Sequence, residues 1–380
     1  MTKRNILLTP GPIPVPESIR QMMAEPIIHH RTPQYRKYFE RASGRIKNIY
    51  MTKNTVYTLT GSGTSAMEAA IVNFHRAGDS ILVVDGGKFG ERFIDIGRAF
   101  GLSVQVLKVP YGDAVNPADI EKALRSNPLI NSVCVELCET STAVLNDIEA
   151  IGKIVARTSA LLIVDAISGL GADRMETDNW RVDLGVAGSQ KGLMLPPGLG
   201  FLSVSDKARQ RMLTANLPRF YLDLRLYEKA LKDWDTPFTP ALTIVLGLHK
   251  AVDMIENEGL EIVLARAAEL GRFTRARLQA MGLQLFSKAP SSTCSAAVVP
   301  DGVDGEKLIK IMRDEKGVTM AGGQGEMKGK LFRLAHLGWV DESDLVVGLA
   351  ALERVLARLG VPVELGAAVA AAQRIFAKES

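Results

Sequence analysis

Lys191 is the residue whose setting most clearly suggests chemistry. It lies in the segment VDLGVAGSQKGLMLPPGLGFLSV, between two apolar runs of strand type and beside Ser189, Gln190 and Gly192. Burial of an unpaired ammonium group is costly. A buried amine that is held neutral, however, is a nucleophile able to form an imine with a carbonyl compound. The alternative is a solvated lysine in a turn.

A buried acid precedes this lysine in the chain. Asp165 ends the apolar run ALLIVDA and is followed by small residues in ISGLG. A carboxylate at the end of a buried strand can pair with a protonated ring nitrogen, cap a following helix or bind magnesium. Taken alone, Asp165 leaves these three roles open.

A glycine-rich turn in TLTGSGTSAMEAA joins a strand-like run to the start of a helix. The free N–H groups and the partial positive charge of a helix N-terminus bind anions. Gly61 and Gly63 allow close approach of a phosphate to the backbone, and Ser62 and Thr64 can donate hydrogen bonds. The turn therefore predicts a phosphate site.

The same turn also fits the dinucleotide fingerprint. Gly61, Gly63 and Ala66 match G-x-G-x-x-[G/A], and Asp85 ends the next strand-like run 24 positions after Gly61. The turn alone does not distinguish a dinucleotide, a pyridoxal-type phosphate and a purely structural turn. The lysine and the acid described above favour pyridoxal 5′-phosphate (PLP), because this cofactor needs an imine-forming amine and an acid beside its pyridine nitrogen.

These residues require a scaffold that brings the ends of strands together. Seven short runs are strand candidates, and several of them are continuously apolar and rich in β-branched residues, as expected for strands covered on both faces. Helical patterns such as SAMEAAIVNFHRAG and LNDIEAIGKIVARTS separate many of them, and this alternation predicts a largely parallel sheet wrapped by helices. The predicted strands cover residues 55–60, 80–85, 104–109, 132–138, 160–166, 182–189 and 200–204.

The pattern changes after about Thr243. One long helical stretch, residues 243–282, leads into mixed strand and helix signals, and the last strong helix begins near Asp341 with an acidic start. An Ala-rich tail at residues 366–373 predicts an end helix. We predict an N-terminal segment at residues 1–15 that packs at the active site, a large cofactor-binding domain at 16–259 and a small C-terminal domain at 260–380.

Composition excludes several classes of protein. With 380 residues, 47% hydrophobic and 23% charged, the chain is typical of a globular protein with a sizeable core. A net charge of +4 without basic clusters gives little support to binding of nucleic acid or of a membrane surface, and no apolar run is long enough to cross a bilayer. We expect neither partner.

The cysteines indicate a reducing compartment. Cys134, Cys138 and Cys294 are odd in number, show no paired spacing and form no metal-binding pattern with the five histidines. The N-terminal run MTKRNILLTPGP breaks at prolines after a few apolar residues and does not fit a signal peptide. We therefore expect no metal and a cytoplasmic location.

Taken together, the motifs resemble the class V aminotransferases of the fold-type-I PLP enzymes, especially the alanine–glyoxylate/serine–pyruvate branch. The resemblance runs essentially from end to end, and the combination of GSGT, VDA and SQK in this order is specific although each motif alone is weak. It implies a mainly parallel seven-stranded sheet sandwiched by helices, with a smaller α+β C-terminal domain. The motifs are LLTPGP, HHRTPQY, TGSGTSAMEA, GGKFGER, ETST, LLIVDA, GSQKGLMLPPG, RFYLDL, DTPFTPA and GKLFRLAHLGW.

The resemblance implies a role for each matching residue. Lys191 would form the Schiff base with PLP and move the α-proton of the substrate, and Asp165 would pair with the pyridinium nitrogen. Arg333 matches the arginine that binds the substrate α-carboxylate, for which a planar guanidinium is suited. Gly11 would place a backbone N–H near the same carboxylate. The implied cofactor contacts are Ser62, Gly63, Thr64 and Gln190 at the phosphate, Phe89 on the ring and Thr140 near the 3′-oxygen.

Thr239 resembles a phosphate ligand that relatives contribute from the neighbouring subunit, which implies a homodimer with shared active sites.

The residues alone leave alternatives open at two of these positions. Phe89 could be a core phenylalanine, and Arg333 could form a structural ion pair. Three positions depart from the pattern of many relatives. Thr236 replaces a tyrosine, Ala143 replaces a glycine, and position 64 is threonine where some relatives have histidine.

The resemblance implies transfer of the amino group of a small L-amino acid, alanine or serine, to a 2-oxo acid such as glyoxylate or pyruvate. An aspartate donor is an alternative, with His30, Arg31 and Arg219 as candidate contacts to its second carboxylate, and so is a 2-aminoethylphosphonate-type donor. A cysteine desulfurase needs an exposed nucleophilic cysteine, whereas Cys294 is better interpreted as structural. An NAD-dependent dehydrogenase using the Gly61 turn is the distant alternative from another class.

Overall fold

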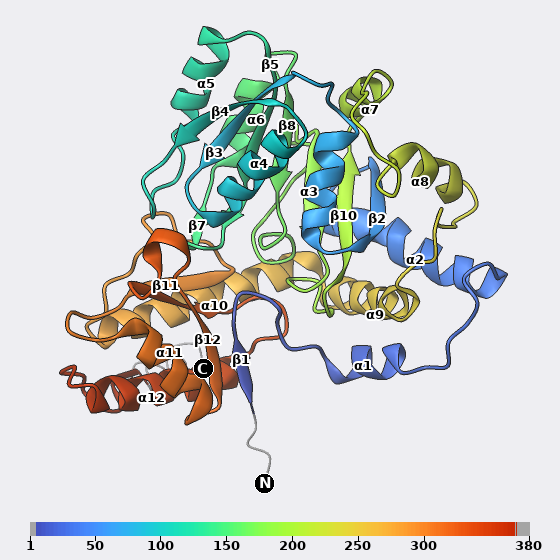
Figure 1. Cartoon of the computed structure of the whole chain (residues 1–380). Coiled ribbons are helices and arrows are strands. Elements are labelled where there is room, and N and C mark those ends of the chain that lie inside the picture. The colour runs from blue at the N-terminus through green and yellow to red at the C-terminus, as the bar shows by residue number, and fades with distance from the viewer. Residues whose placement is uncertain (1–4, 369, 371–380) are drawn as a thin grey trace.

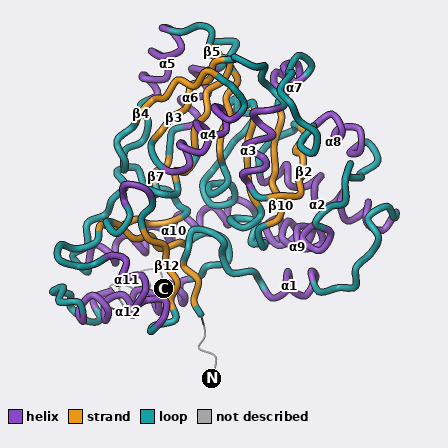
Figure 2. Tube along the Cα trace, in the orientation of Figure 1, coloured by secondary structure: helices purple, strands orange, loops and turns teal. Residues whose placement is uncertain are grey.

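The computed structural model describes residues 5–368 and 370. It contains a seven-stranded sheet between two layers of helices and, beside it, a four-stranded sheet with helices of its own (Figure 1). Figure 2 shows strands and helices distributed through both parts. The predicted α/β class, with a mainly parallel seven-stranded sheet and a smaller α+β part, is confirmed.

The large sheet contains all seven predicted strands. They are β2 (Thr55–Gly61), β3 (Ser80–Asp85), β4 (Ser103–Lys108), β5 (Ile130–Glu136), β8 (Leu161–Asp165), β9 (Leu184–Gly188) and β10 (Gly198–Val204). Their order is β2-β10-β9-β8-β5-β3-β4. The ladders from β9 to β4 are parallel, whereas β10 is antiparallel to both of its neighbours. All strands except β10 therefore run in one direction.

Helices cover both faces of this sheet. Successive side chains of a strand point to opposite faces, and in β8 Leu162 and Val164 enter one hydrophobic core while Leu161 and Ile163 enter the other. The first core is lined by α1 (Glu17–Met23), α2 (Pro33–Ile49), α5 (Pro117–Ser126), α6 (Ile148–Val155) and α9 (Leu242–Glu258). The second is lined by α3 (Gly63–Val72), α4 (Lys88–Ala99), α7 (Asp206–Met212) and α8 (Leu224–Leu231).

The four-stranded sheet joins the two ends of the chain. Its strands are β1 (Ile6–Leu8), β12 (Val318–Gly322), β13 (Leu331–Ala335) and β11 (Cys294–Val298), in this order, with β1 parallel to β12. The helices α10 (Leu260–Ala280), α11 (Gly305–Asp314) and α12 (Glu342–Arg358) pack on it. A 3-10 turn, Gly325–Met327, and the hairpin of β6 (Cys138–Glu139) and β7 (Val144–Leu145) complete the elements.

One predicted element is wrong in its extent. The helical stretch at residues 243–282 is two helices, because the chain breaks at Gly259, whose φ of +94° is rarely adopted by residues with a side chain. The helix predicted near Asp341 is confirmed, and the Asp341 side chain caps α12 by accepting a hydrogen bond from the Asp344 backbone. Residues 369 and 371–373 of the predicted end helix lie outside the described residues. The division at residue 259 stays a prediction.

Membrane-spanning helices are not found in the described part of the chain, where every helix is too short or too polar to cross a bilayer.

Candidate active site

Most of the predicted site residues follow strands that end at one edge of the large sheet, and Gly11, Thr239 and Arg333 are the exceptions. In an open α/β sheet, ligands bind beyond the carboxyl ends of the parallel strands. Here β2 is followed by Ser62, Gly63 and Thr64, β3 by Phe89, β5 by Thr140, and β9 by Gln190 and Lys191, while Asp165 is the last residue of β8.

Lys191 lies in a buried, polar setting. Only 7% of its surface is exposed, and its Nζ donates hydrogen bonds to the Pro10 carbonyl and, over 3.1 Å, to Oγ of Ser168. Burial disfavours the charged form and lowers the pKa of the ammonium group to about 8. At near-neutral pH the amine is therefore neutral, and nucleophilic, far more often than that of an ordinary lysine.

Asp165 is almost completely buried at the end of β8. Its Oδ1 accepts a hydrogen bond of 2.7 Å from the backbone of Ile167. Burial raises its pKa to about 6, and Glu139 acts in the same direction, while Arg92 and Lys191 favour the ionised form. Above pH 6 the group is a buried anion, which suits it to pair with a cationic ring nitrogen.

A cavity of about 240 Å³ brings many of the predicted residues together. It lies where the loops after β2, β3, β8 and β9 meet the N-terminal segment. Lys191, Gln190, Phe89 and Gly11 border it with the phosphate turn at residues 62–64. Its walls also contain four residues that were not among the predicted ones, namely Pro12, Arg92, Ile167 and Pro197.

Two glycines make the close packing around this cavity possible. A Cβ built at Gly11, whose φ is +131°, would lie 2.3 Å from Cε of Lys191. A Cβ at Gly63 would lie 2.5 Å from Cδ1 of Ile167. Real Cβ atoms do not approach other atoms so closely, so a side chain at either position would displace its neighbour.

Ser168 connects Thr140 to Lys191. Its hydroxyl oxygen accepts hydrogen bonds from Oγ1 of Thr140 and from Nζ of Lys191, and the residue is 4% exposed. Ser168 was not predicted as a site residue. The available signal was weak, because it is one small polar residue in the run of small residues after Asp165.

Arg333 lies close to this group without bordering the cavity. Its two terminal nitrogens donate hydrogen bonds of 2.7 Å to the carbonyls of Thr140 and Gly322, and its Nε has no partner among the described residues. Its charge contributes to the lowered pKa of Lys191, after burial. The guanidinium therefore links β13 to the loop after β5 through carbonyl groups, and no described residue forms an ion pair with it.

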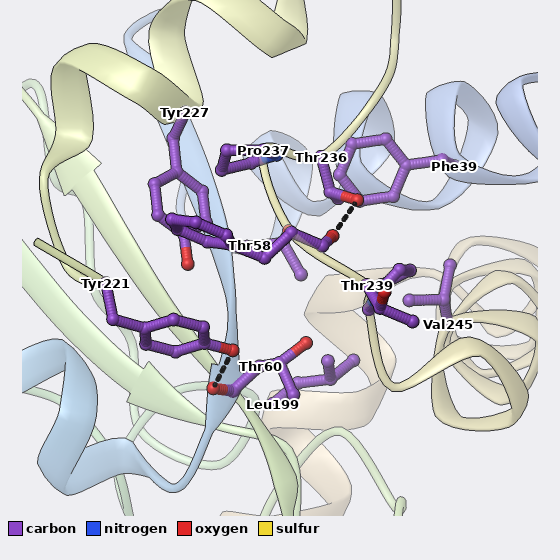
Figure 3. Close-up of a pocket in the computed structure, with 12 residues that line it drawn as sticks. Phe39, Thr58, Thr60, Leu199, Tyr221, Tyr227, Thr236, Pro237, Thr239 and Val245 are labelled. Atoms are coloured by element: carbon purple, nitrogen blue, oxygen red, sulfur yellow. Dashed lines mark hydrogen bonds between the residues drawn. The ribbon is translucent and has the colours of Figure 1, made fainter. Parts of the chain in front are cut away.

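The TPFTP segment lies at a second, much smaller cavity. Thr236 and Thr239 border this space of about 10 Å³, together with Thr60 and Tyr221 (Figure 3). The Thr236 hydroxyl donates a 2.8 Å hydrogen bond to the Phe238 carbonyl, and the Tyr221 hydroxyl donates to the Thr60 carbonyl over 3.3 Å. Thr239 is exposed and does not border the Lys191 cavity of its own chain.

The three candidate contacts to a second substrate carboxylate do not border the Lys191 cavity. Arg31 donates hydrogen bonds of 2.7 Å to Asp235 and to the Thr236 carbonyl. Arg219 donates to the carbonyls of residues 72, 215 and 217. The ring of His30 lies beside that of His29. Within one chain, these side chains are engaged elsewhere.

Comparison with known proteins identifies the family. The profile of the family described as aminotransferase class-V matches residues 18–331. The chain belongs to the class V aminotransferases.

Relatives of this class V aminotransferase match it over nearly their whole length. The soluble hydrogenase small subunit of Synechococcus sp. is 41% identical, with 99% of each chain covered. The serine–glyoxylate aminotransferase of Methylorubrum extorquens is 36% identical, covering 97% of this chain and 95% of the relative. The L-aspartate–glyoxylate aminotransferase of Paracoccus denitrificans is 35% identical, covering 99% and 97%.

Solved structures confirm the fold of this class V aminotransferase. The ureidoglycine–glyoxylate aminotransferase of Bacillus subtilis superposes with a TM-score of 0.94 at 26% identity, with 99% of both chains covered. The aspartate aminotransferase of Thermus thermophilus gives 0.87 at 33% identity, covering 93% of this chain and 99% of that one. Neither the family match nor these proteins support the dehydrogenase alternative.

PLP is the cofactor of class V aminotransferases of this fold, and the residues of the cavity fit it. The buried carboxamide oxygen of Gln190 has no partner among the described residues, so the polar wall of the cavity is incomplete without a ligand. Gly63 and Thr64 open helix α3, whose N-terminal N–H groups suit a phosphate. Lys191 supplies a partly neutral amine. Asp165 does not border the cavity itself but supplies a buried acid that acts electrostatically on Lys191.

Ala143 and Thr236, two of the departures from the family pattern, have a clear structural setting. Ala143 is fully buried with φ of +60°, a conformation that costs a non-glycine residue about 1 kcal/mol. Its carbonyl accepts a hydrogen bond from the Ser291 backbone, which ties the β6–β7 turn to the segment before β11. The Thr236 hydroxyl is used within its own loop. Neither residue contacts Lys191 or Asp165.

Proposed function

We propose that this class V aminotransferase transfers the amino group of a small L-amino acid, alanine or serine, to a 2-oxo acid such as glyoxylate or pyruvate. The observation that carries the proposal is Lys191, a buried amine with a pKa of about 8 beside a phosphate turn and a buried acid. The relative in Methylorubrum extorquens, a serine–glyoxylate aminotransferase, supports serine and glyoxylate as substrates. A cytoplasmic location stays a prediction from the cysteine usage.

Lys191 has two tasks in this proposal. As a neutral amine, Nζ would hold PLP, and it would also carry the α-proton of the substrate. PLP, when bound, supplies an electron sink that acidifies this α-proton. A pKa of about 8 suits both tasks, because a proton carrier works best when its pKa lies near the working pH. Ser168 and the Pro10 carbonyl orient Nζ from two sides.

Asp165 would pair with the ring nitrogen of the cofactor and favour its protonated form. A buried carboxylate facing a cation gains from the low local dielectric, and the backbone N–H of Ile167 holds its oxygen in place. Phe89 borders the cavity and is proposed to stack on the ring, while Ser62, Gly63, Thr64 and Gln190 hold the phosphate. Thr140 is proposed to contact the 3′-oxygen side, since its hydroxyl lies one hydrogen bond from Ser168.

The substrate carboxylate is proposed to bind Arg333 and the backbone N–H of Gly11. Gly11 lies against Lys191, so a group bound there is close to the reacting amine. Arg333 influences Lys191 electrostatically and keeps Nε unpartnered. A carboxylate must replace at least one carbonyl partner of its terminal nitrogens to be bound by both of them, and the stronger charge-assisted bond favours that exchange.

A small donor is favoured over aspartate because the two arginines predicted as contacts to a second carboxylate have other partners. Arg31 and Arg219 are already engaged and do not border the cavity of their own chain. A donor panel of L-alanine, L-serine and L-aspartate against glyoxylate, pyruvate and 2-oxoglutarate tests this choice. The proposal predicts the highest kcat/KM with alanine or serine, and a preference for aspartate would contradict it.

We further propose a homodimer whose active sites use Thr239 of the partner subunit. An exposed aromatic patch lies beside this threonine, with Phe220 75% and Tyr221 41% exposed and the rings of Tyr221 and Phe238 5.0 Å apart. Large exposed aromatic groups mark interaction surfaces. Thr239 is exposed and does not border the Lys191 cavity of its own chain. Its hydroxyl is therefore proposed to reach the cavity of a second copy of the chain.

Subunit mixing tests the shared site. Mixed dimers of Lys191→Ala and Thr239→Ala chains should contain one site with both native residues, and that site should bind PLP with wild-type affinity. The Thr239→Ala homodimer should bind PLP more weakly, whereas Thr214→Ala, another exposed threonine, should not differ from wild type. Light scattering that shows a monomer, or mixed dimers that fail to recover affinity, would contradict the shared site.

A further inference from the structure

Arg92 is a charged residue of the cavity that the roles above leave unused. It lies on α4, three residues after Phe89, so both side chains belong to one face of the helix. Its guanidinium carbon lies 4.9 Å from the centre of the Phe89 ring, and one terminal nitrogen lies 3.4 Å from Oγ1 of Thr64. Its charge also favours the ionised form of Asp165, although no described residue forms a direct ion pair with Arg92.

The position of Arg92 is set by contacts at the start of α4. The Glu139 carboxylate accepts hydrogen bonds from the backbone N–H groups of Phe89 and Gly90, and Ser141 Oγ accepts one from that of Lys88. These bonds tie the first turn of α4 to the loop that carries Thr140. The backbone that carries Arg92 is therefore fixed beside the cavity by the scaffold, and its side chain is placed by Thr64 and the Phe89 ring.

Without Arg92, the positive charge at the phosphate turn is smaller than the negative charge of a phosphate. Ser62, Gly63, Thr64 and Gln190 offer neutral donors, and the N-terminus of α3 adds roughly half a positive charge. A phosphate monoester carries about −1.5 to −2 charges at neutral pH. Arg92 and Lys191 are the cationic side chains that border the cavity, and Lys191 is committed to the imine.

We propose that Arg92 is a binding residue for the phosphate of the cofactor, acting with Thr64. The Thr64 hydroxyl oxygen accepts from Arg92, which leaves its proton free to be donated to a phosphate oxygen. The guanidinium supplies the missing positive charge, and the Phe89 ring supports it by a cation–π contact. This inference rests on the use of PLP by this chain.

A different ligand could bind at Arg92, and the test must distinguish it from the cofactor phosphate. An arginine at the cavity wall could instead bind the side-chain carboxylate of a dicarboxylic donor. The proximity to Thr64, on the turn at the start of α3, favours the phosphate. The two occupants predict different measurements, because one changes the affinity for PLP and the other the KM for aspartate.

The test compares PLP with pyridoxal, which lacks the phosphate. Dissociation constants of both are measured for the apoenzyme by titration of the visible band, in wild type, Arg92→Gln and Arg92→Lys. Arg92→Gln should weaken PLP about 10- to 100-fold, as expected for a lost hydrogen bond to a charged group, and leave pyridoxal within about threefold. Arg92→Lys keeps the charge and should lose less affinity. Arg98→Gln removes an exposed arginine from the same helix and should change neither constant.

Inorganic phosphate provides a readout that does not need the imine. Phosphate should raise the melting temperature of the wild-type apoenzyme and compete with PLP, and Arg92→Gln should reduce both effects. Equal losses of PLP and pyridoxal affinity, unchanged PLP affinity, or an effect confined to the KM for aspartate would overturn the inference. If wild type itself forms no visible band with PLP, the proposed function fails instead.

Discussion

Ser168 offers the sharpest test of how Lys191 is tuned. In the structure Nζ of Lys191 has two acceptors, the Pro10 carbonyl and Oγ of Ser168. The Ser168→Ala substitution removes one of them from a buried amine. The ammonium form loses more than the neutral amine, because a hydrogen bond from a charged donor is the stronger one.

The size of the effect follows from these bonds. A hydrogen bond to a charged group contributes about 1.5–3 kcal/mol and one between neutral groups about 0.5–1.5 kcal/mol, so the difference is roughly 1–1.5 kcal/mol. One pH unit corresponds to about 1.4 kcal/mol. The pKa of Lys191 should therefore fall from about 8 to about 7. At pH 7 the neutral fraction would rise about fivefold.

The assay is pH-dependent acetylation of the apoenzyme, with the Lys191 peptide quantified by mass spectrometry. Wild type should titrate near 8, against an ordinary value of 10.5, and Ser168→Ala about one unit lower with the same plateau at high pH. Ser295→Ala is the matched control, because Ser295 is a buried serine whose hydroxyl bonds to His336. A Ser168→Ala curve that coincides with wild type, or moves to higher pH, would refute the reasoning.

Three further substitutions test other parts of the site. Asp165→Asn should lower kcat at least 100-fold, yet raise the stability of the apoenzyme above pH 6 by up to roughly 3 kcal/mol. The sign follows from the raised pKa of Asp165, because the folded state prefers the protonated form and loses stability as pH rises from 3.8 through 6. Calorimetry at pH 5 and pH 8 measures this difference in stability. Gly11→Ala should abolish covalent capture of PLP, because its Cβ would overlap Cε of Lys191, and the absence of a visible band is the readout. Arg333→Ala should raise the KM for amino acids about 10- to 100-fold through loss of a charged hydrogen bond, and an unchanged KM would show that the carboxylate binds elsewhere.

Much of the fold follows from local sequence patterns. The seven apolar runs are strands because a strand buried on both faces needs apolar residues at successive positions, as Leu161 to Val164 show in β8. The break between α9 and α10 was not predicted, because Gly259 is one of several glycines within an otherwise helical pattern. The pairing of β1 with β12 joins residues more than 300 positions apart, and no local sequence pattern indicates it.

The site residues also differ in whether the sequence predicts them. Lys191, Asp165 and the turn at residues 62–64 follow strands, so their convergence is predictable from the order of strands and helices. Ser168 and Arg92 are defined by which neighbour their side chains reach, and this depends on loop conformation and on the placement of α4. The carbonyl partners of Arg333 come from two distant segments and required the packing of the small sheet on the large one.

The most direct test of the account is to locate the covalent link between the chain and PLP. The purified enzyme is incubated with PLP, reduced with borohydride, digested and analysed by mass spectrometry, with Lys191→Ala as the control. The account predicts a single phosphopyridoxyl modification, on Lys191, and none in the control. A modification on another lysine, or equal labelling of the Lys191→Ala chain, would contradict it.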